Sequence, residues 1–311
     1  MHVDSSQQHE RGQVLAIFAL GLVAIIAMTG LVLDGGSTFV QRRDMQNVAD
    51  ASAMAGAYAY VNSGSVSAAT VAAEQAAQAN GYPEGADGVV VDVAVNPFAA
   101  GTSVQVSVRK PHRNHFSGIV GMSSWDVATT ATALGGPPNT AIGAAPIIFN
   151  ALAFPGAIGE ANARSFSEPG TGTEDVPQGS VQFNWTIYCT ASGNPCNANS
   201  DGVDDLIAGT NQSGNVITMA DEIGPLNAGA HATLFSSLAS LVGEEFPVAI
   251  VDDDGTFLGI AMFKLTGSVG GSTKAISGYF LDSYAGPELR IDPNTPPGTS
   301  IYGLYTVYLA D

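Results

Sequence analysis

Oxygen-bearing side chains alternate along one short segment in the second half of the chain. They belong to Asn197, Asn199, Asp201 and Asp205, with a glycine between the two aspartates. Carboxylate and amide oxygens at alternate positions before a glycine resemble the first half of a calcium-binding loop. Such a loop requires an acid at its twelfth position, where this chain has Ala208. The segment is therefore either a calcium site, the one cofactor that the sequence indicates, or an acidic turn held by a neighbouring disulfide.

The two cysteines of the chain lie close to that segment. Cys189 and Cys196 flank six residues that include a glycine and a proline. In an exported chain, a lone close pair is expected to form a disulfide that closes a turn. Two free thiols are the alternative reading. No further cysteine or nearby histidine completes a zinc ligand set.

Nucleophilic catalysis finds little support in the sequence. The G-x-S-x-G elbow of the α/β-hydrolases does not occur, and neither does a phosphate-binding P-loop. Of the five histidines, only His231 belongs to the second half of the chain. We therefore expect no enzymatic activity, and a membrane-anchored hydrolase that uses His231 stays an alternative.

The composition excludes one broad class of function. The 311 residues include 10 lysines and arginines against 28 acids, a formal net charge of −18. Nucleic-acid binding requires a basic surface that displaces counterions, so we expect no nucleic-acid partner. Repulsion between molecules that all carry this negative charge suits a protein that stays soluble outside the cell.

An uncharged apolar run, Val14–Leu33, organises the first part of the chain. A bilayer-spanning helix needs about 20 such residues, whereas the core of a signal peptide has about 7–15. We expect a polar tail over 1–12 and a retained transmembrane helix over 13–34, with membrane lipid as a partner. A buried core helix is the alternative, and the absence of a polar face argues against it.

The residues around the run disagree about orientation. Arg11 precedes the run, while Arg42 and Arg43 follow it. The positive-inside rule then places the following chain in the cytoplasm. The cysteine pair and the acidic bulk favour the outside instead. We expect a single-pass protein of the cell membrane with an extracellular bulk, an orientation that Arg42 and Arg43 in part contradict.

Beyond the run, the helical pattern becomes amphipathic. Met45, Ala49, Ser52 and Gly56 fall on one face at helical spacing, and most of this face is small. A second helix, expected over 65–80, carries a similar face of alanines. Small faces let two backbones approach closely, so we expect an antiparallel helix pair. A surface helix on a sheet is the alternative.

Asp34 and the two glycines after it mark the outer edge of the expected span. Ionisable groups embedded in membranes are costly and often functional, so Asp34 is interpreted as a contact with another helix. Gly35 and Gly36 predict a bend of the helix.

The remaining chain predicts an α+β fold. Alternating valines indicate a strand hairpin between residues 89 and 108, followed by a short helix and a third strand ending near Leu134. With the two helices, they form an α+β module over 35–134. Gly- and Pro-rich residues 135–146 predict a linker. Short strands separated by glycine-rich turns over 147–311 predict a β-rich extracellular domain, a sandwich or partly open barrel.

One long sequence pattern in the first part of the chain is hard to match by chance. A glycine leads the apolar helix, an aspartate stands at its outer end, and the pattern Arg-x-x-x-Gln-x-x-Ala-Asp-x-x-Ala-x-Ala-Gly-Ala follows. These positions are Gly12, Asp34, Arg42, Gln46, Ala49, Asp50, Ala53, Ala55, Gly56 and Ala57. The stretch resembles the N-terminal signature of the TadE/TadG-like proteins of Flp-type (tight adherence) pilus assembly. Through FSGIVGMSSWDVATTATA, the likeness extends over roughly residues 11–134.

The resemblance implies a membrane-anchored, minor pilin-like protein that acts in the assembly or surface display of Flp-type pili, or in adhesion. Its partners would be other pilin-like or Tad-machinery proteins. Flp pilins resemble a class that is cut after a glycine and has a Glu five residues further on, where this chain has Ile17. That departure favours an accessory role. The alternative is a subunit that polymerises with itself into an extracellular filament, with the helix in the core and the β domain outside.

Overall fold

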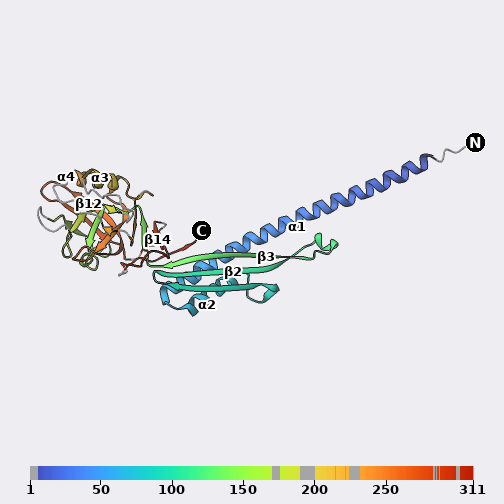
Figure 1. Ribbon diagram of the computed structural model, residues 1–311, viewed down its shortest axis with the longest axis horizontal. Helices are drawn as coiled ribbons and strands as arrows, with labels where there is room; N and C mark the ends of the chain where they lie inside the picture. Colours follow the sequence, from blue (N-terminus) through green and yellow to red (C-terminus); the bar gives the residue numbers. More distant parts are fainter. Residues whose placement is uncertain are drawn as a thin grey trace, which may run out of the picture.

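The molecule is long, with a single helix at one end and a β-rich body at the other (Figure 1). The computed structural model describes residues 6–169, 176–189, 200–213, 215–220, 222–223, 232–282, 284, 286, 288–298 and 302–310. A long N-terminal apolar helix precedes mixed and then mostly β structure, which confirms the predicted α+β class.

The first helix, α1, runs from Ser6 to Ser63 without a break. At 1.5 Å per residue, its 58 residues extend about 87 Å. The bend predicted at Gly35 and Gly36 does not occur, so that prediction is wrong. Glycine makes bending cheap but does not require it, and α1 contacts the same strand hairpin on both sides of the glycine pair. These contacts hold the axis straight.

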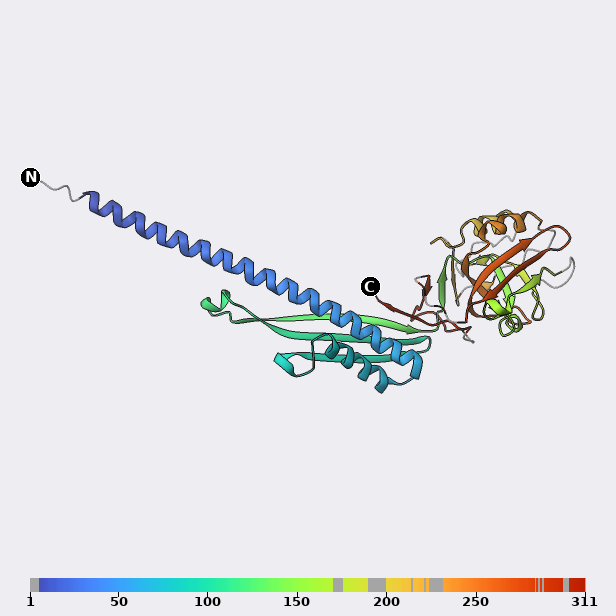
Figure 2. The ribbon, with the colours of Figure 1, turned by 180° about the vertical axis from the view of Figure 1, so that it is seen from behind.

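A short turn leads from α1 into the second helix, α2 (Val66–Ala79). Gly64 takes a left-handed conformation in the turn, with φ of 65°, which costs glycine little. The Ser65 side chain accepts a hydrogen bond from the backbone N–H of Ala68 and so caps α2. The helix then packs against the end of α1 (Figure 2) through buried alanines.

Four antiparallel strands form the sheet beneath α1, in the order β1-β2-β3-β15. Their bounds are β1 (Val90–Phe98), β2 (Gly101–Arg113), β3 (Ser124–Gly136) and β15 (Thr306–Leu309). Alternate valines of β1 and β2 point toward α1 and α2, where they join Met45 and a row of alanines in one core. We call this unit the stalk module.

The fourth strand of the stalk module comes from the end of the chain. β15 pairs with residues 133–136 of β3, whereas the sequence predicted residues 301–309 as part of the outer β domain. Residues 135–146, predicted as a linker, contain the end of β3 and the short strand β4 (Thr140–Ile142).

The β-rich body is built on a six-stranded sheet in the order β6-β13-β12-β11-β5-β7. A bridge between Ser167 and Gln182 brings its two edges together, so the sheet curls into a partly open barrel. Phenylalanine rings fill it, with the centroids of Phe149 and Phe263 4.8 Å apart. The strands are β5 (Ile147–Asn150), β6 (Arg164–Ser167), β7 (Phe183–Trp185), β11 (Glu245–Val251), β12 (Phe257–Val269) and β13 (Ala275–Phe280).

Smaller elements complete the body. A three-stranded sheet has the order β14-β4-β9, and a pair joins β10 to β8. Their bounds are β8 (Tyr188–Cys189), β9 (Val216–Thr218), β10 (Glu222–Ile223) and β14 (Leu289–Arg290), beside the helices α3 (Ser200–Ala208) and α4 (Ala232–Leu238). Short 3-10 turns are η1 (Ala86–Gly88), η2 (Ser117–Val120), η3 (Ala151–Ala153), η4 (Glu160–Asn162) and η5 (Ala239–Leu241).

Candidate functional site

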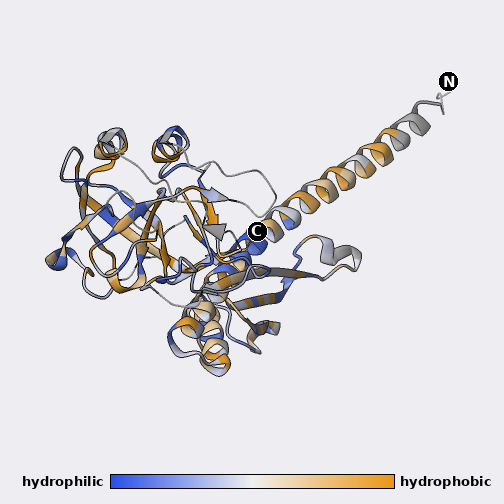
Figure 3. Cartoon of the chain, turned by 60° about the vertical axis from the view of Figure 1, so that its left-hand side comes forward, coloured by the Kyte–Doolittle hydropathy of each residue, from blue (hydrophilic) through white to orange (hydrophobic). Residues whose placement is uncertain are grey.

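The apolar run of α1 is exposed along almost its whole length, with Gly30 buried. Its large apolar side chains are 49–73% exposed, and only 6% of its most apolar 18-residue window is buried. Figure 3 shows this half of α1 as a continuous apolar rod. The structure describes one helix that is long and apolar enough to cross a membrane.

A buried carboxylate stands at the edge of that rod. Asp34 is 1% exposed, and its carboxylate accepts hydrogen bonds from three successive backbone N–H groups. The donors are His115 at 2.9 Å, Phe116 at 3.0 Å and Ser117 at 2.6 Å. These residues belong to the turn between β2 and β3, residues 114–123, which we call the hairpin tip. Successive N–H groups of this kind form a small anion-binding cradle, here filled by a side chain of the same molecule.

Gly30, one helical turn before Asp34, lets the hairpin tip approach α1. A Cβ atom at Gly30 would lie 2.5 Å from the Cβ of Phe116, far inside van der Waals contact. Residues four apart lie on one helix face. Gly30 and Asp34 therefore form one docking face, the first by its missing side chain and the second by its charge.

Two further side chains of α1 hold the stem of the same hairpin. Gln41 accepts from Nδ1 of His112 at 2.6 Å and donates to the carbonyl of Lys110 at 3.2 Å. The hydroxyl of Ser37 lies 3.0 Å from Nε2 of His112. His112 is 9% exposed and is therefore buried between the hairpin and α1. Its ring is a polar link between the hairpin and α1.

The docking residues Gly30, Asp34, Ser37 and Gln41 follow one another at spacings of four, three and four. That spacing keeps them on one face of a helix. The next residue on the same line is Met45, the first member of the buried face that the sequence predicted. Of the upstream half of this line, the sequence analysis named only Asp34; Gly30, Ser37 and Gln41 were missed because they are small or polar and Gly30 lies inside the apolar run. Continuing the helical period backward from Met45 would have found them.

The predicted interface residues of α1 are all buried. Met45, Ala49 and Ser52 are 0% exposed. A Cβ atom on Gly56 would lie 2.9 Å from a methyl of Val104 and 3.1 Å from the carbonyl of Ala69. The face thus touches α2 and the sheet together, where the sequence offered these contacts as alternatives.

Asp34, the fifth interface residue, is placed differently. Its carboxylate contacts backbone N–H groups of the hairpin tip, as far as the first residue of the 3-10 turn η2, and not the side of an α-helix. The polar partner that a carboxylate at the membrane edge requires is therefore supplied within the chain.

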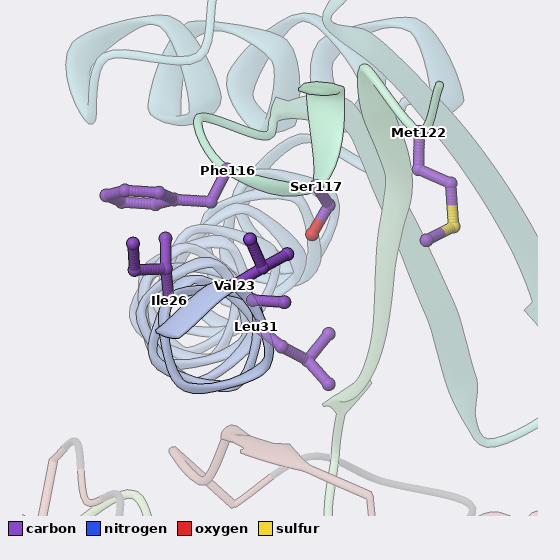
Figure 4. A pocket seen from close by; sticks show the side chains of 7 residues that line it. Val23, Ile26, Leu31, Phe116, Ser117 and Met122 are labelled. Carbon is purple, nitrogen blue, oxygen red and sulfur yellow. The ribbon is translucent and has the colours of Figure 1, made fainter. Parts of the chain in front are cut away.

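An apolar groove opens beside this site. It has a volume of about 380 Å³ and lies between the apolar run and the hairpin tip. In Figure 4, side chains of α1 face those of the tip across it. Its tip residues Phe116 and Met122 are 41% and 50% exposed. The groove is lined by Val23, Ile26, Ala27, Leu31, Phe116, Ser117 and Met122.

The predicted calcium residues are only partly described. Asp201 and Asp205 lie one turn apart on α3, in a segment where a loop was expected. Asn197 and Asn199 lie outside the described residues. Within the described part of the chain, no group of three or more His, Cys, Asp and Glu side chains could hold a metal ion. The calcium site stays a prediction.

The same holds for the other chemistry predicted in the body. Cys189 ends β8 and pairs with Glu222 of β10 in the backbone ladder. Cys196 and His231 lie outside the described residues. The disulfide therefore stays a prediction, and the hydrolase alternative has no described residue to support it.

Comparison with known proteins identifies one segment. Residues 12–59 match the family model described as putative Flp pilus-assembly TadE/G-like, which confirms the resemblance over that segment. The match contains the apolar run and the whole docking face of α1, and it stops before the hairpin tip. No curated protein and no solved structure matches the chain.

Proposed function

We propose that this chain is a membrane-anchored cell-envelope protein that acts in the assembly or surface display of Flp-type pili. The observation that carries the proposal is the exposed apolar helix within the segment matched by the TadE/G-like family model. The role is non-enzymatic, and the partners are other pilin-like or Tad-machinery proteins.

Energetics support a membrane for the apolar run. Thirteen large apolar side chains of residues 14–33 are exposed. Each stabilises by roughly 1.5–3 kcal/mol when fully buried, so together they are worth about 20 kcal/mol or more. That exceeds the ~5–15 kcal/mol stability of a typical domain. A helix of this kind needs an apolar surrounding, and a run of about 20 residues matches the ~30 Å hydrocarbon core of a bilayer.

The second half of α1 then acts as a rigid spacer. From Asp34 to its end at Ser63, α1 extends about 44 Å at 1.5 Å per residue. Contacts with α2 and the sheet keep this half rigid. The β-rich body at the far end (Figure 1) is thereby held away from the lipid, where it meets partners or surfaces. Exposed Arg42 and Arg43 lie about 12 Å beyond Asp34, within reach of lipid headgroups.

Alkaline extraction of membranes tests the anchor. The full chain should stay in the membrane pellet, and a variant without residues 13–33 should be released as a soluble body. Protease added to intact cells should digest the β-rich body if it is extracellular. A truncated protein that still pellets, or a body protected in intact cells and digested only after lysis, contradicts the proposal.

A filament subunit is the second candidate function. The observation that favours it is a second exposed apolar surface, on the stalk module, lined by Met54, Ala55, Tyr58, Ala59, Ala72 and Val307. Neighbouring copies could pack through this surface and through the apolar run together. Electron microscopy of the purified full chain distinguishes the two functions, because regular helical filaments would replace the accessory role.

A further inference from the structure

The hairpin tip lies at the depth of the apolar run. Asp34 is the first residue beyond that run. Gly30, against which Phe116 packs, lies about 6 Å closer to the membrane centre. Val23, at the far end of the groove, lies about 16 Å closer. If residues 14–33 fill a hydrocarbon core of about 30 Å, the groove faces the acyl chains of one leaflet.

The hairpin tip suits that surrounding because most of its backbone N–H groups are hydrogen-bonded within the chain. An unpaired N–H or C=O in lipid costs several kcal/mol. The carboxylate of Asp34 accepts from three of the tip's N–H groups. The remaining bonds cross the turn: Asn114 N–H to Ser123, its side-chain amide to Met122, and Met122 N–H to Ser117. These donors in turn stabilise the carboxylate in its charged form.

The sequence of the tip is graded from polar to apolar. Residues 116–123 contain no charged side chain, while Arg113 and His115 precede them. Both of these side chains are exposed. A cationic arginine and a polar histidine beside an apolar wedge fit the order of headgroups and acyl chains at a membrane surface.

We propose that the hairpin tip is a second membrane contact, inserted through Phe116 and Met122 into the leaflet on the body side. The occupant of the groove is the acyl chain of a bilayer lipid. The groove is continuous with a helix surface that lipid covers on its other sides. Its one polar side chain, that of Ser117, is buried and leaves a peptide little to bind. A single helix is free to rotate about its axis, whereas a helix with a lateral contact has one preferred rotation and tilt. This inference rests on the proposed anchor.

Fluorescence quenching tests the insertion. Met122→Trp is introduced into the full chain in a Trp125→Phe background and reconstituted in phosphatidylcholine vesicles whose acyl chains carry bromine. Trp185, fully buried in the body, remains as an internal reference. The new tryptophan is expected to lose fluorescence in brominated vesicles relative to unbrominated ones. Phe116→Trp in the same background is a second probe of the tip.

Val269→Trp in the same background is the matched control. Val269 is 54% exposed, close to the 50% of Met122, but lies in the body. It should keep its fluorescence in brominated vesicles. Vesicle flotation distinguishes the proposed membrane anchor from the proposed insertion of the hairpin tip. Protein that floats without quenching at either tip position overturns the inserted tip and leaves the anchor intact, whereas protein that does not float overturns both. Equal quenching at Val269 means unspecific adsorption and also overturns the inference.

Discussion

Replacing Asp34 by asparagine tests the contact that joins the hairpin tip to α1. Asparagine keeps the size of the side chain but has one acceptor oxygen, and an amide replaces the other. The carboxylate accepts from the three N–H groups of residues 115–117 through both oxygens. In D34N, one oxygen serves these donors, and the new amide faces another N–H. Each oxygen of the carboxylate makes two of the four N–H···O contacts, because the N–H of Phe116 contacts both, so two of the four contacts are lost.

The lost hydrogen bonds determine how much more often the hairpin tip opens in D34N. A hydrogen bond to a charged group contributes on the order of a tenfold factor to an equilibrium constant. Loss of two therefore predicts local opening of the hairpin tip that is roughly a hundredfold more frequent. The effect stays local because the core around Met45 and the paired strands is separate from the tip. The melting temperature of the stalk module should change little.

Amide hydrogen exchange of the full chain in detergent micelles measures this opening. The amides of residues 115–117 should exchange roughly a hundredfold faster in D34N, while those of β2 and β3 keep their protection. The matched control is Asp44→Asn, because Asp44 is exposed on the same helix. Unchanged exchange at 115–117 in D34N, or equal acceleration in D44N, would refute the role of the carboxylate.

Three further predictions concern stability. Met45→Ala should lower the free energy of unfolding by about 2–5 kcal/mol, measured by denaturant titration, because Met45 is fully buried in the stalk core. Ser52→Ala should raise it by roughly 1 kcal/mol, since the buried Ser52 hydroxyl has no hydrogen-bond partner among the described residues. The N–H of Asn294 and the hydroxyl of Thr295 lower the pKa of Asp292. Its stabilising contribution is therefore complete above the unfolded pKa of about 3.9 and is lost as pH falls through the folded pKa. Asp292→Asn should remove this part of the acid sensitivity in thermal melts.

The sequence predicts those parts of the structure whose signal is local. The apolar run is recognised by its length and lack of charge. The small face from Met45 to Gly56 and the alternating valines of β1 and β2 each repeat with the period of one element. A period identifies the face that is buried, and the structure buries these faces. It does not identify the partner across that face, which is why contacts with α2 and with the sheet were left as alternatives.

The missed features depend on contacts between distant residues. Asp34 bonds to groups 81–83 positions away, and β15 pairs with a strand about 170 positions earlier. The hairpin was expected between residues 89 and 108, yet β2 continues through Pro111 to Arg113. β1 pairs with β2 only as far as Arg109, so Pro111 lies where one neighbouring strand is absent, a position that proline tolerates. The same period of two that buries the valines then buries His112.

The return of the chain to the stalk module restricts the orientation of the β-rich body relative to that module. The chain leaves the module at Gly136 and re-enters it at Thr306, and these two residues are paired neighbours. Between the two crossings, the buried side chain of Asn139 donates to the carbonyls of Asp292 and Thr295 and accepts from the N–H of Asp292. Two crossings joined in this way resist rotation better than one linker does. The proposed membrane contact, which would set the rotation of α1, would then also set the direction in which the body faces, and the proposed display along a pilus would benefit from that fixed direction.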